Sequence, residues 1–179
     1  SEEIGKSIKL MEMFGLPGLK NLNNYFKDIK KSQFQNISLI TETNISKKIP
    51  YCPLITGISF MDQIHSLEKY NKIIFNNMAY PILLIPFISR SSEIIGKRLS
   101  LTVESETFLL NFNQSIYLKS NLSNIKDKTE VLEIEFLKNE NTFDEKDWEE
   151  LYKISEETFV KENESLKNTA AGAGLTDND

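Results

Sequence analysis

The fold is decided first by residues 1–31, which read SEEIGKSIKLMEMFGLPGLKNLNNYFKDIKK. Ile4, Ile8 and Met11 recur at spacings of four and three residues, which predicts an amphipathic helix that stops at Gly15. Pro17 suits the first turn of a second helix, whose apolar face is expected to comprise Leu19, Leu22, Phe26 and Ile29. The short segment 15–18 therefore predicts a tight corner between two helices.

Further along the chain, the apolar period changes from that of a helix to that of a strand. Between residues 80 and 136, apolar and polar side chains alternate, which predicts the strands of an antiparallel sheet. The alternating positions are Ile82, Leu84, Leu99, Leu101, Val103, Ile116, Leu118 and the run 131–136. Turns are expected at residues 104–106 and 113–114. Pro81 and Pro86 place the first strand at a sheet edge or at a bulge.

Residues 54–62 fit two structures. Their β-branched side chains favour a strand, whereas Ile58, Met61, Ile64 and His65 would share one face of a helix. The sequence does not decide between a strand and a helix for this segment.

A last helix is predicted from residue 144 onward. Asp144 is suited to cap it, and Trp148, Leu151, Tyr152, Ile154 and Phe159 supply an apolar side. We therefore predict a single α+β domain over residues 1–164, with an N-terminal helical pair, a central mostly antiparallel sheet and a C-terminal helix. A tail rich in Gly and Ala follows over residues 165–179.

Composition and charge exclude several classes of protein. The chain has 179 residues with one cysteine and one histidine, which excludes an internal disulfide framework, a multi-cysteine zinc site and an HExxH zinc helix. The net charge of −5 argues against a nucleic-acid partner. No apolar run approaches the roughly 20 residues that span a bilayer, and no signal peptide is recognisable. We expect a cytoplasmic protein without a membrane partner, whose first residue, Ser1, indicates an incomplete or processed N-terminus.

The charge is unevenly distributed. Residues 1–129 carry 16 Lys or Arg and 11 Asp or Glu, whereas residues 130–164 carry 4 and 13. The acidic part is either a docking surface or a solvated helix face.

Three residues outside the tail are candidates for catalysis. Cys52 needs a base to become a nucleophilic thiolate, and His65 is the only histidine that could supply one; an unreactive buried thiol is the alternative. Arg90 offers a bidentate fork for a carboxylate or phosphate, or else forms a surface ion pair. Asp62 is suited to a general base, a ligand or a helix cap.

The tail supplies the candidate ligand-binding residues. Gly172 and Gly174 allow backbone N–H groups to approach an anion. Asp177, Asn178 and Asp179 offer oxygen ligands, so Asp177 and Asp179 are weak candidates for binding Mg²⁺ or Ca²⁺. Small residues also allow insertion into a groove of a second copy or of a protein partner. The alternative is a chain end without a function.

Three stretches resemble an uncharacterised bacterial family, domain of unknown function 3726. They are the opening EEIGK (2–6) with GLPGL (15–19), the segment CPLITG (52–57) and the closing GAGLTDND (172–179). Pro86-Phe87 and Asp147-Trp148 are similar to the family too. The resemblance implies that the tail is a defining feature and that a helical stretch precedes residue 1, but it implies no activity.

From these observations we expect an accessory or binding protein of small-molecule metabolism whose pocket the C-terminal tail helps to close. One alternative is a small metal-assisted or carboxylate-based enzyme, and another is a structural subunit of a larger complex or homo-oligomer. The sequence leaves the ligand, the cofactor and the partner undetermined.

Overall fold

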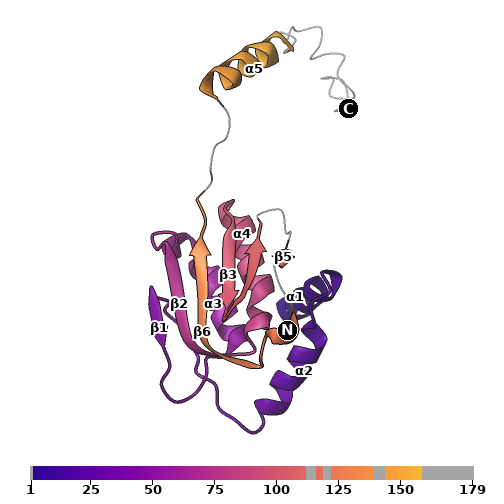
Figure 1. Cartoon of the computed structure of the whole chain (residues 1–179), viewed down its shortest axis with the longest axis vertical. Coiled ribbons are helices and arrows are strands. Elements are labelled where there is room, and N and C mark those ends of the chain that lie inside the picture. The colour runs from indigo at the N-terminus through magenta and orange to yellow at the C-terminus, as the bar shows by residue number, and fades with distance from the viewer. Residues whose placement is uncertain (1, 112–115, 119–121, 139–143, 159–179) are drawn as a thin grey trace, which may run out of the picture. The chain divides into compact units, whose positions relative to one another are not determined.

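The computed structural model describes residues 2–111, 116–118, 122–138 and 144–158 (Figure 1). The chain divides into two compact units, Ser1–Asn139 and Glu140–Asp179. Unit 1 contains, in chain order, α1 (Glu2–Met13), α2 (Gly18–Asp28), β1 (Thr43–Ile45), α3 (Pro53–Leu67), β2 (Lys72–Ala79), η1 (Pro81–Leu84), α4 (Ile85–Ile95), β3 (Leu99–Val103), β4 (Glu106–Leu110), β5 (Ile116–Leu118), η2 (Leu122–Asn124) and β6 (Lys128–Phe136). Unit 2 contains α5 (Glu145–Thr158). The predicted boundary after residue 164 lies outside the described residues.

Unit 1 is built on a six-stranded sheet with the strand order β1-β2-β6-β3-β4-β5. β1 pairs with β2 in parallel, and the other neighbouring strands are antiparallel. This confirms the α+β class and the mostly antiparallel sheet. The β3–β4 turn comprises Glu104 and Ser105. Glu106, which was predicted to belong to the turn, is instead the first residue of β4 and pairs with Val103 of β3. The turn expected at 113–114 lies outside the described residues.

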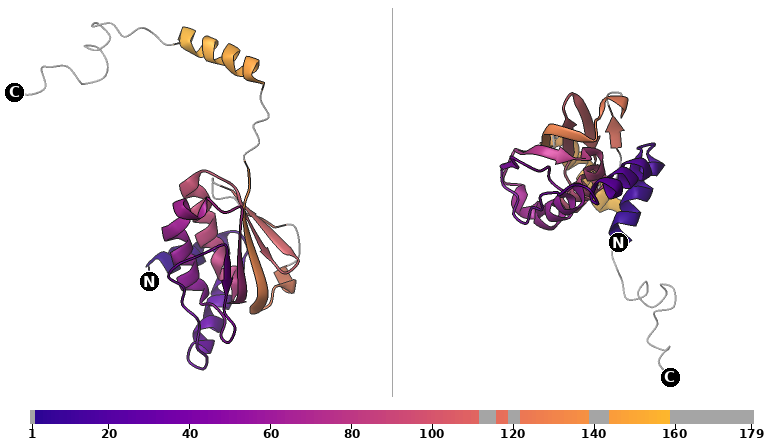
Figure 2. Two further views of the ribbon diagram at one scale, coloured as in Figure 1. Left: turned by 90° about the vertical axis from the view of Figure 1, so that its left-hand side faces the viewer. Right: turned by 90° about the horizontal axis from the view of Figure 1, so that it is seen from below.

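Helices α3 and α4 cover one face of the sheet, as Figure 2 shows from the side. Every second residue of the central strands is buried beneath them. These residues are Ile73, Phe75, Leu99, Leu101, Phe108, Leu110, Leu132 and Ile134. Residues between them, such as Lys72 and Glu133, are partly exposed. Burial of apolar surface, at about 25 cal/mol per Å², holds the helical layer on the sheet.

The strand predicted around Ile82 and Leu84 is wrong. Both residues lie in the 3₁₀ helix η1, which leads directly into α4. Proline stands in the first turn of each of these helices, where its missing N–H group is tolerated. The helical period is hidden because residues 81–89 are all buried. The strand directly before this segment is β2, which ends at Ala79.

Residues 54–62, for which the sequence allowed either a strand or a helix, are helical and lie within α3. Pro53 occupies its first turn, and Gly57 faces α4. A Cβ atom added at Gly57 would lie 2.4 Å from Cδ2 of Phe87. The absence of a side chain therefore permits the close approach of α3 to α4.

The predicted helical pair is confirmed, but its buried face is different. Gly15 takes a φ of +69°, and the N–H of Leu16 donates to the carbonyl of Met11 at 2.9 Å, which closes α1. Leu19 and Phe26 are 63% and 49% exposed. Tyr25 is the buried aromatic residue of α2, and its ring packs against those of Phe34 and Tyr80.

The predicted C-terminal helix is confirmed as α5. The Oδ1 atom of Asp144 accepts a hydrogen bond from the N–H of Lys146 at 3.0 Å, so Asp144 caps the helix as predicted. Its large apolar side chains, Trp148, Leu151, Tyr152 and Ile154, are 56–62% exposed. The position of Phe159 lies outside the described residues.

We expect Gly57→Ala to lower the free energy of unfolding by about 1–3 kcal/mol, because its methyl group overlaps the Phe87 ring. Gly5→Ala is the matched control. It places the same methyl group in a helix with no atom within 4 Å, and should stabilise the protein by about 0.5–1 kcal/mol. Urea unfolding measures the free energy of unfolding of both variants. Equal changes in the two variants would contradict the close contact between Gly57 and Phe87.

The ion pair between Glu68 and Lys97 should make stability depend on pH. Lys97 Nζ lies 2.5 Å from Glu68 Oε2 and lowers the pKa of that carboxyl, with a smaller contribution from His65. Because the pKa is lower in the folded state, the pair stabilises the fold above the unfolded value of about 4.3. That stabilisation is lost as the pH falls through the folded pKa. Lys97→Met should therefore cost about 0.5–1 kcal/mol at pH 7 and progressively less below pH 4 in urea titrations. A cost that does not change with pH would contradict this assignment.

Candidate functional site

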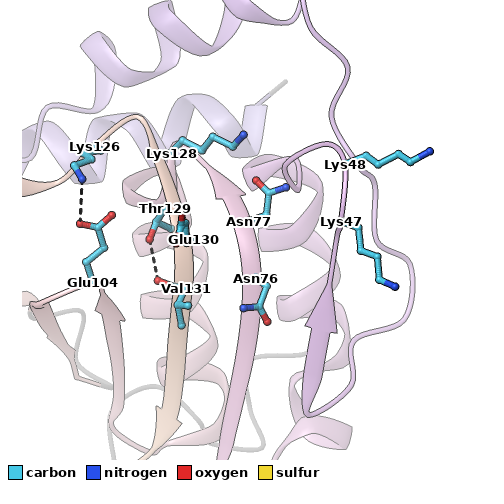
Figure 3. A pocket seen from close by; sticks show the side chains of 10 residues that line it. All are labelled: Lys47, Lys48, Asn76, Asn77, Glu104, Lys126, Lys128, Thr129, Glu130 and Val131. Carbon is cyan, nitrogen blue, oxygen red and sulfur yellow. Dashed lines mark hydrogen bonds and ion pairs between the residues drawn. The ribbon is translucent and has the colours of Figure 1, made fainter.

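A groove with a volume of about 900 Å³ lies where β2 ends and β6 begins (Figure 3). The segment after β1 and the β3–β4 turn complete it. Ten residues line it, most of them lysines, asparagines and glutamates. They are Lys47, Lys48, Asn76, Asn77, Glu104, Lys126, Lys128, Thr129, Glu130 and Val131. We call this the lysine–asparagine groove.

A break in the strand pairing shapes the groove. β2 and β6 pair at Asn76 with Val131 and at Met78 with Thr129, whereas Asn77 takes a φ of +67°. Asparagine tolerates this left-handed conformation better than most residues. The carbonyl of Asn77 accepts from the N–H of Tyr51 at 2.8 Å, and its side-chain amide donates to the carbonyl of Ser46 at 3.1 Å. These bonds fix the chain that carries Lys47 and Lys48 beside β2.

The groove carries an excess of positive charge. Its lining holds four lysines and two glutamates, and the ion pair drawn in Figure 3 joins Lys126 to Glu104 at 4.0 Å. Lys47, Lys48 and Lys128 form no ion pair with any described residue. Ammonium groups only donate hydrogen bonds, and each asparagine amide adds two donors. The groove is therefore suited to an anion that bears carboxylate or phosphate groups.

At the start of β2, away from this groove, the sheet carries an ion-pair cluster. Lys72 Nζ lies 2.9 Å from Glu133 and 2.7 Å from Glu135, and hydrogen bonds to both carboxylates raise the pKa of Lys72. Its charge is thus neutralised within the fold. This contrasts with the three lysines of the groove.

Arg90 lies on α4, where the sequence predicted a segment that follows a strand. It lines a smaller groove of about 460 Å³ between α1 and α4, together with Lys6, Lys9, Ser89 and Glu93. The Ser89 hydroxyl is buried and has no hydrogen-bond partner among the described residues. Arg90, Lys6 and Glu93 each interact with other residues. The structure therefore does not indicate that the Arg90 guanidinium is available to bind a carboxylate or phosphate.

The Cys52 and His65 pairing is not formed. Cys52 caps the start of α3 and is 3% exposed, whereas His65 lies in the last turn, about 20 Å away along the helix axis. His65 instead lies 3.5 Å from Glu68. The Cys52 Sγ atom lies 3.3 Å from the hydroxyl of Tyr25, whose pKa is raised by burial and then by this hydrogen bond. Cys52 is a buried thiol within a packing contact.

Asp62 is exposed on α3 and lies outside the lysine–asparagine groove. The structure therefore does not bring Asp62, Arg90 and Cys52 together in one site. Gly172, Gly174, Asp177, Asn178 and Asp179 lie outside the described residues, and their predicted binding roles stay predictions. Among the residues that are described, no three His, Cys, Asp or Glu side chains are grouped closely enough to hold a metal ion. Within the same ranges, every helix is too short or too polar to cross a membrane.

The sequence did not reveal the lysine–asparagine groove. Its residues come from four separated segments, 47–48, 76–77, 104 and 126–131, and none of them forms a recognisable motif. One signal was present, namely the clustering of Lys126 and Lys128 around a polar turn. Glu106 is another omission, since it is 3% exposed and its Oε1 atom accepts from Asn124 at 2.8 Å.

Comparison with known proteins adds a family. Residues 1–51 match a family model described as "Protein of unknown function (DUF3726)". The match spans α1, α2, β1 and the two lysines at 47 and 48, and it is to the family that the sequence resembles. Neither the curated proteins nor the solved structures yielded a match. The family description names no activity, so the function has to be argued from the site.

Cys52 should be unreactive in the native protein. A thiol reagent such as dithionitrobenzoate should modify it at least about 100-fold more slowly than in urea, because the reaction requires the α2–α3 contact to open. His65→Ala should leave the native rate unchanged, and Tyr25→Phe should raise it. A rate that falls in His65→Ala would restore the histidine as a base for Cys52.

Proposed function

We propose that this protein is a cytoplasmic accessory protein that binds a small anionic metabolite in the lysine–asparagine groove. One observation supports this most directly: three lysines without an acidic partner among the described residues surround one polar groove. Bringing like charges together destabilises a fold unless a bound anion compensates them. Carboxylate and phosphate oxygens are the acceptors that match this set of donors.

The groove favours binding over catalysis. Its only carboxylates are Glu104, which lies 4.0 Å from Lys126, and Glu130. The hydroxyl residue of the lining, Thr129, is 2% exposed and donates its hydrogen bond to the carbonyl of Val131 at 2.9 Å rather than to a carboxylate. The volume of about 900 Å³ is ample for a metabolite-sized ligand.

The metal-assisted enzyme is the runner-up proposal, and no described residue favours it specifically. It predicts a divalent-ion dependence that Asp177→Asn abolishes. Closure of the pocket by residues 165–179 likewise stays a prediction, since they lie outside the described residues.

The test is calorimetric titration of the full chain with two probes, inorganic pyrophosphate and citrate. At least one should bind saturably at low salt and more weakly at 0.15 M salt, because the contacts are exposed and screened. Replacing Lys47, Lys48 and Lys128 together by Gln should raise the Kd about tenfold, or about 1.4 kcal/mol, if each lysine contributes a few tenths to one kcal/mol.

Lys20, Lys27 and Lys30 provide the matched control. Changing these three α2-side lysines to Gln removes the same net charge away from the groove, and should leave the Kd within about twofold. If both triple variants weaken anion binding equally, the net charge of the protein rather than the groove determines the affinity. Absence of saturable binding by either probe would overturn the proposed function.

A further inference from the structure

The exposed apolar surface of the helical pair points to a second function of unit 1. α1 and α2 form a groove of about 520 Å³ whose apolar lining is Ile4, Ile8, Leu19, Leu22 and Phe26. Leu19 is 63% exposed and Phe26 49%, although both belong to the regular apolar stripe of α2. Large exposed apolar side chains gathered in one groove are typical of an interaction surface. This surface is distinct from the lysine–asparagine groove.

Two charges in the groove identify the partner. Among the lining residues that the structure describes, Lys9 and Glu12 carry the charges, and they are three residues apart on α1. Neither forms an ion pair with another described residue. The Oε1 atom of Glu12 accepts the N–H of Leu19 at 2.8 Å, which holds the carboxylate at the edge of the groove.

We propose that this groove binds the same groove of a second copy of the chain, forming a twofold symmetric dimer. In a twofold contact, if residue i of one copy meets residue j of the other, then j also meets i. Two antiparallel α1 helices can therefore place Lys9 against Glu12 of the second copy, and Glu12 against its Lys9. The pairing satisfies both charges while the apolar side chains of the two grooves cover one another.

The geometry of helices supports this arrangement. Lys9 and Glu12 are about 4.5 Å apart along the axis of α1, so a single crossing can place both symmetric ion pairs side by side. Two helical pairs then form a four-helix arrangement with an apolar centre, which is a stable way to bury such stripes. A purely acidic partner would place negative charge opposite Glu12, and a purely basic partner would place positive charge opposite Lys9. Either partner would therefore repel one of the two residues.

The test is the oligomeric mass of the full chain by native mass spectrometry and light scattering. We expect a species of twice the 20.6 kDa chain mass at micromolar concentration. Phe26→Glu should raise the dimer dissociation constant at least tenfold, because it places a charge at the apolar centre. Leu39→Glu is the matched control: Leu39 is 71% exposed and outside the groove, and the dimer should persist.

A charge exchange tests the symmetry itself. Lys9→Glu and Glu12→Lys should each weaken the dimer about tenfold, because each sets like charges opposite one another twice. The double variant restores opposite charges across the twofold axis and should recover most of the affinity. Lys20→Glu makes the same change of charge outside the groove and should have little effect.

Three outcomes would overturn the proposal. The first is a wild-type chain that remains monomeric up to about 100 μM. The second is a dimer that Phe26→Glu leaves intact but Leu151→Glu on α5 dissociates, which would assign the interface to α5. The third is a double charge variant no better than either single one, since a second copy bound in another way would not be rescued. Far-ultraviolet circular dichroism of each variant verifies that it is folded.

Discussion

The antiparallel pairing of β2 with β6 is the interaction on which unit 1 depends. It joins residues 72–79 to residues 128–136, with Phe75 opposite Leu132 at its buried centre. β1 is attached to the sheet through β2, whereas β3, β4 and β5 are attached through β6. Without this pairing the sheet would fall into two parts, neither of which could cover α3 and α4. Its paired residues are 49 to 63 positions apart in the chain, so these contacts form only at the cost of a large loop entropy.

The end of the same pairing creates the candidate site. After Asn76 the regular ladder is interrupted, because Asn77 takes up a left-handed conformation and turns its carbonyl toward Tyr51. Tyr80 then anchors the end of the strand. Its N–H donates to the carbonyl of Asp127 at 2.7 Å, and its hydroxyl donates to Asp28 at 2.6 Å, while burial, followed by this hydrogen bond, raises its pKa. One short stretch, 77–80, thus supplies Asn77 to the groove and connects the sheet with the end of α2 through Tyr80 and Asp28.

Charge separates the two units along the chain. Residues 1–139 carry 17 Lys or Arg and 14 Asp or Glu, a balance of +3, whereas residues 140–179 carry 4 and 12, a balance of −8. Within unit 1, the groove lining holds four lysines and two glutamates. On the sheet face, by contrast, Glu133 and Glu135 neutralise Lys72. Local pairing, and not the net charge of −5, therefore decides where an anion can bind.

Local sequence signals predicted those helices and strands for which the period of the apolar residues and the terminal residues were both recognisable. The helical pair followed from the stripe of Ile4, Ile8 and Met11 with its Gly15 stop, and α5 followed from the cap at Asp144. β3 and β6 showed the period of two because apolar residues alternate with polar ones along each strand. Only the tertiary structure decided residues 81–95, since a helix buried on nearly every side has no polar face to reveal its period. It also decided the candidate site, because the four segments that line it meet only when β2 pairs with β6.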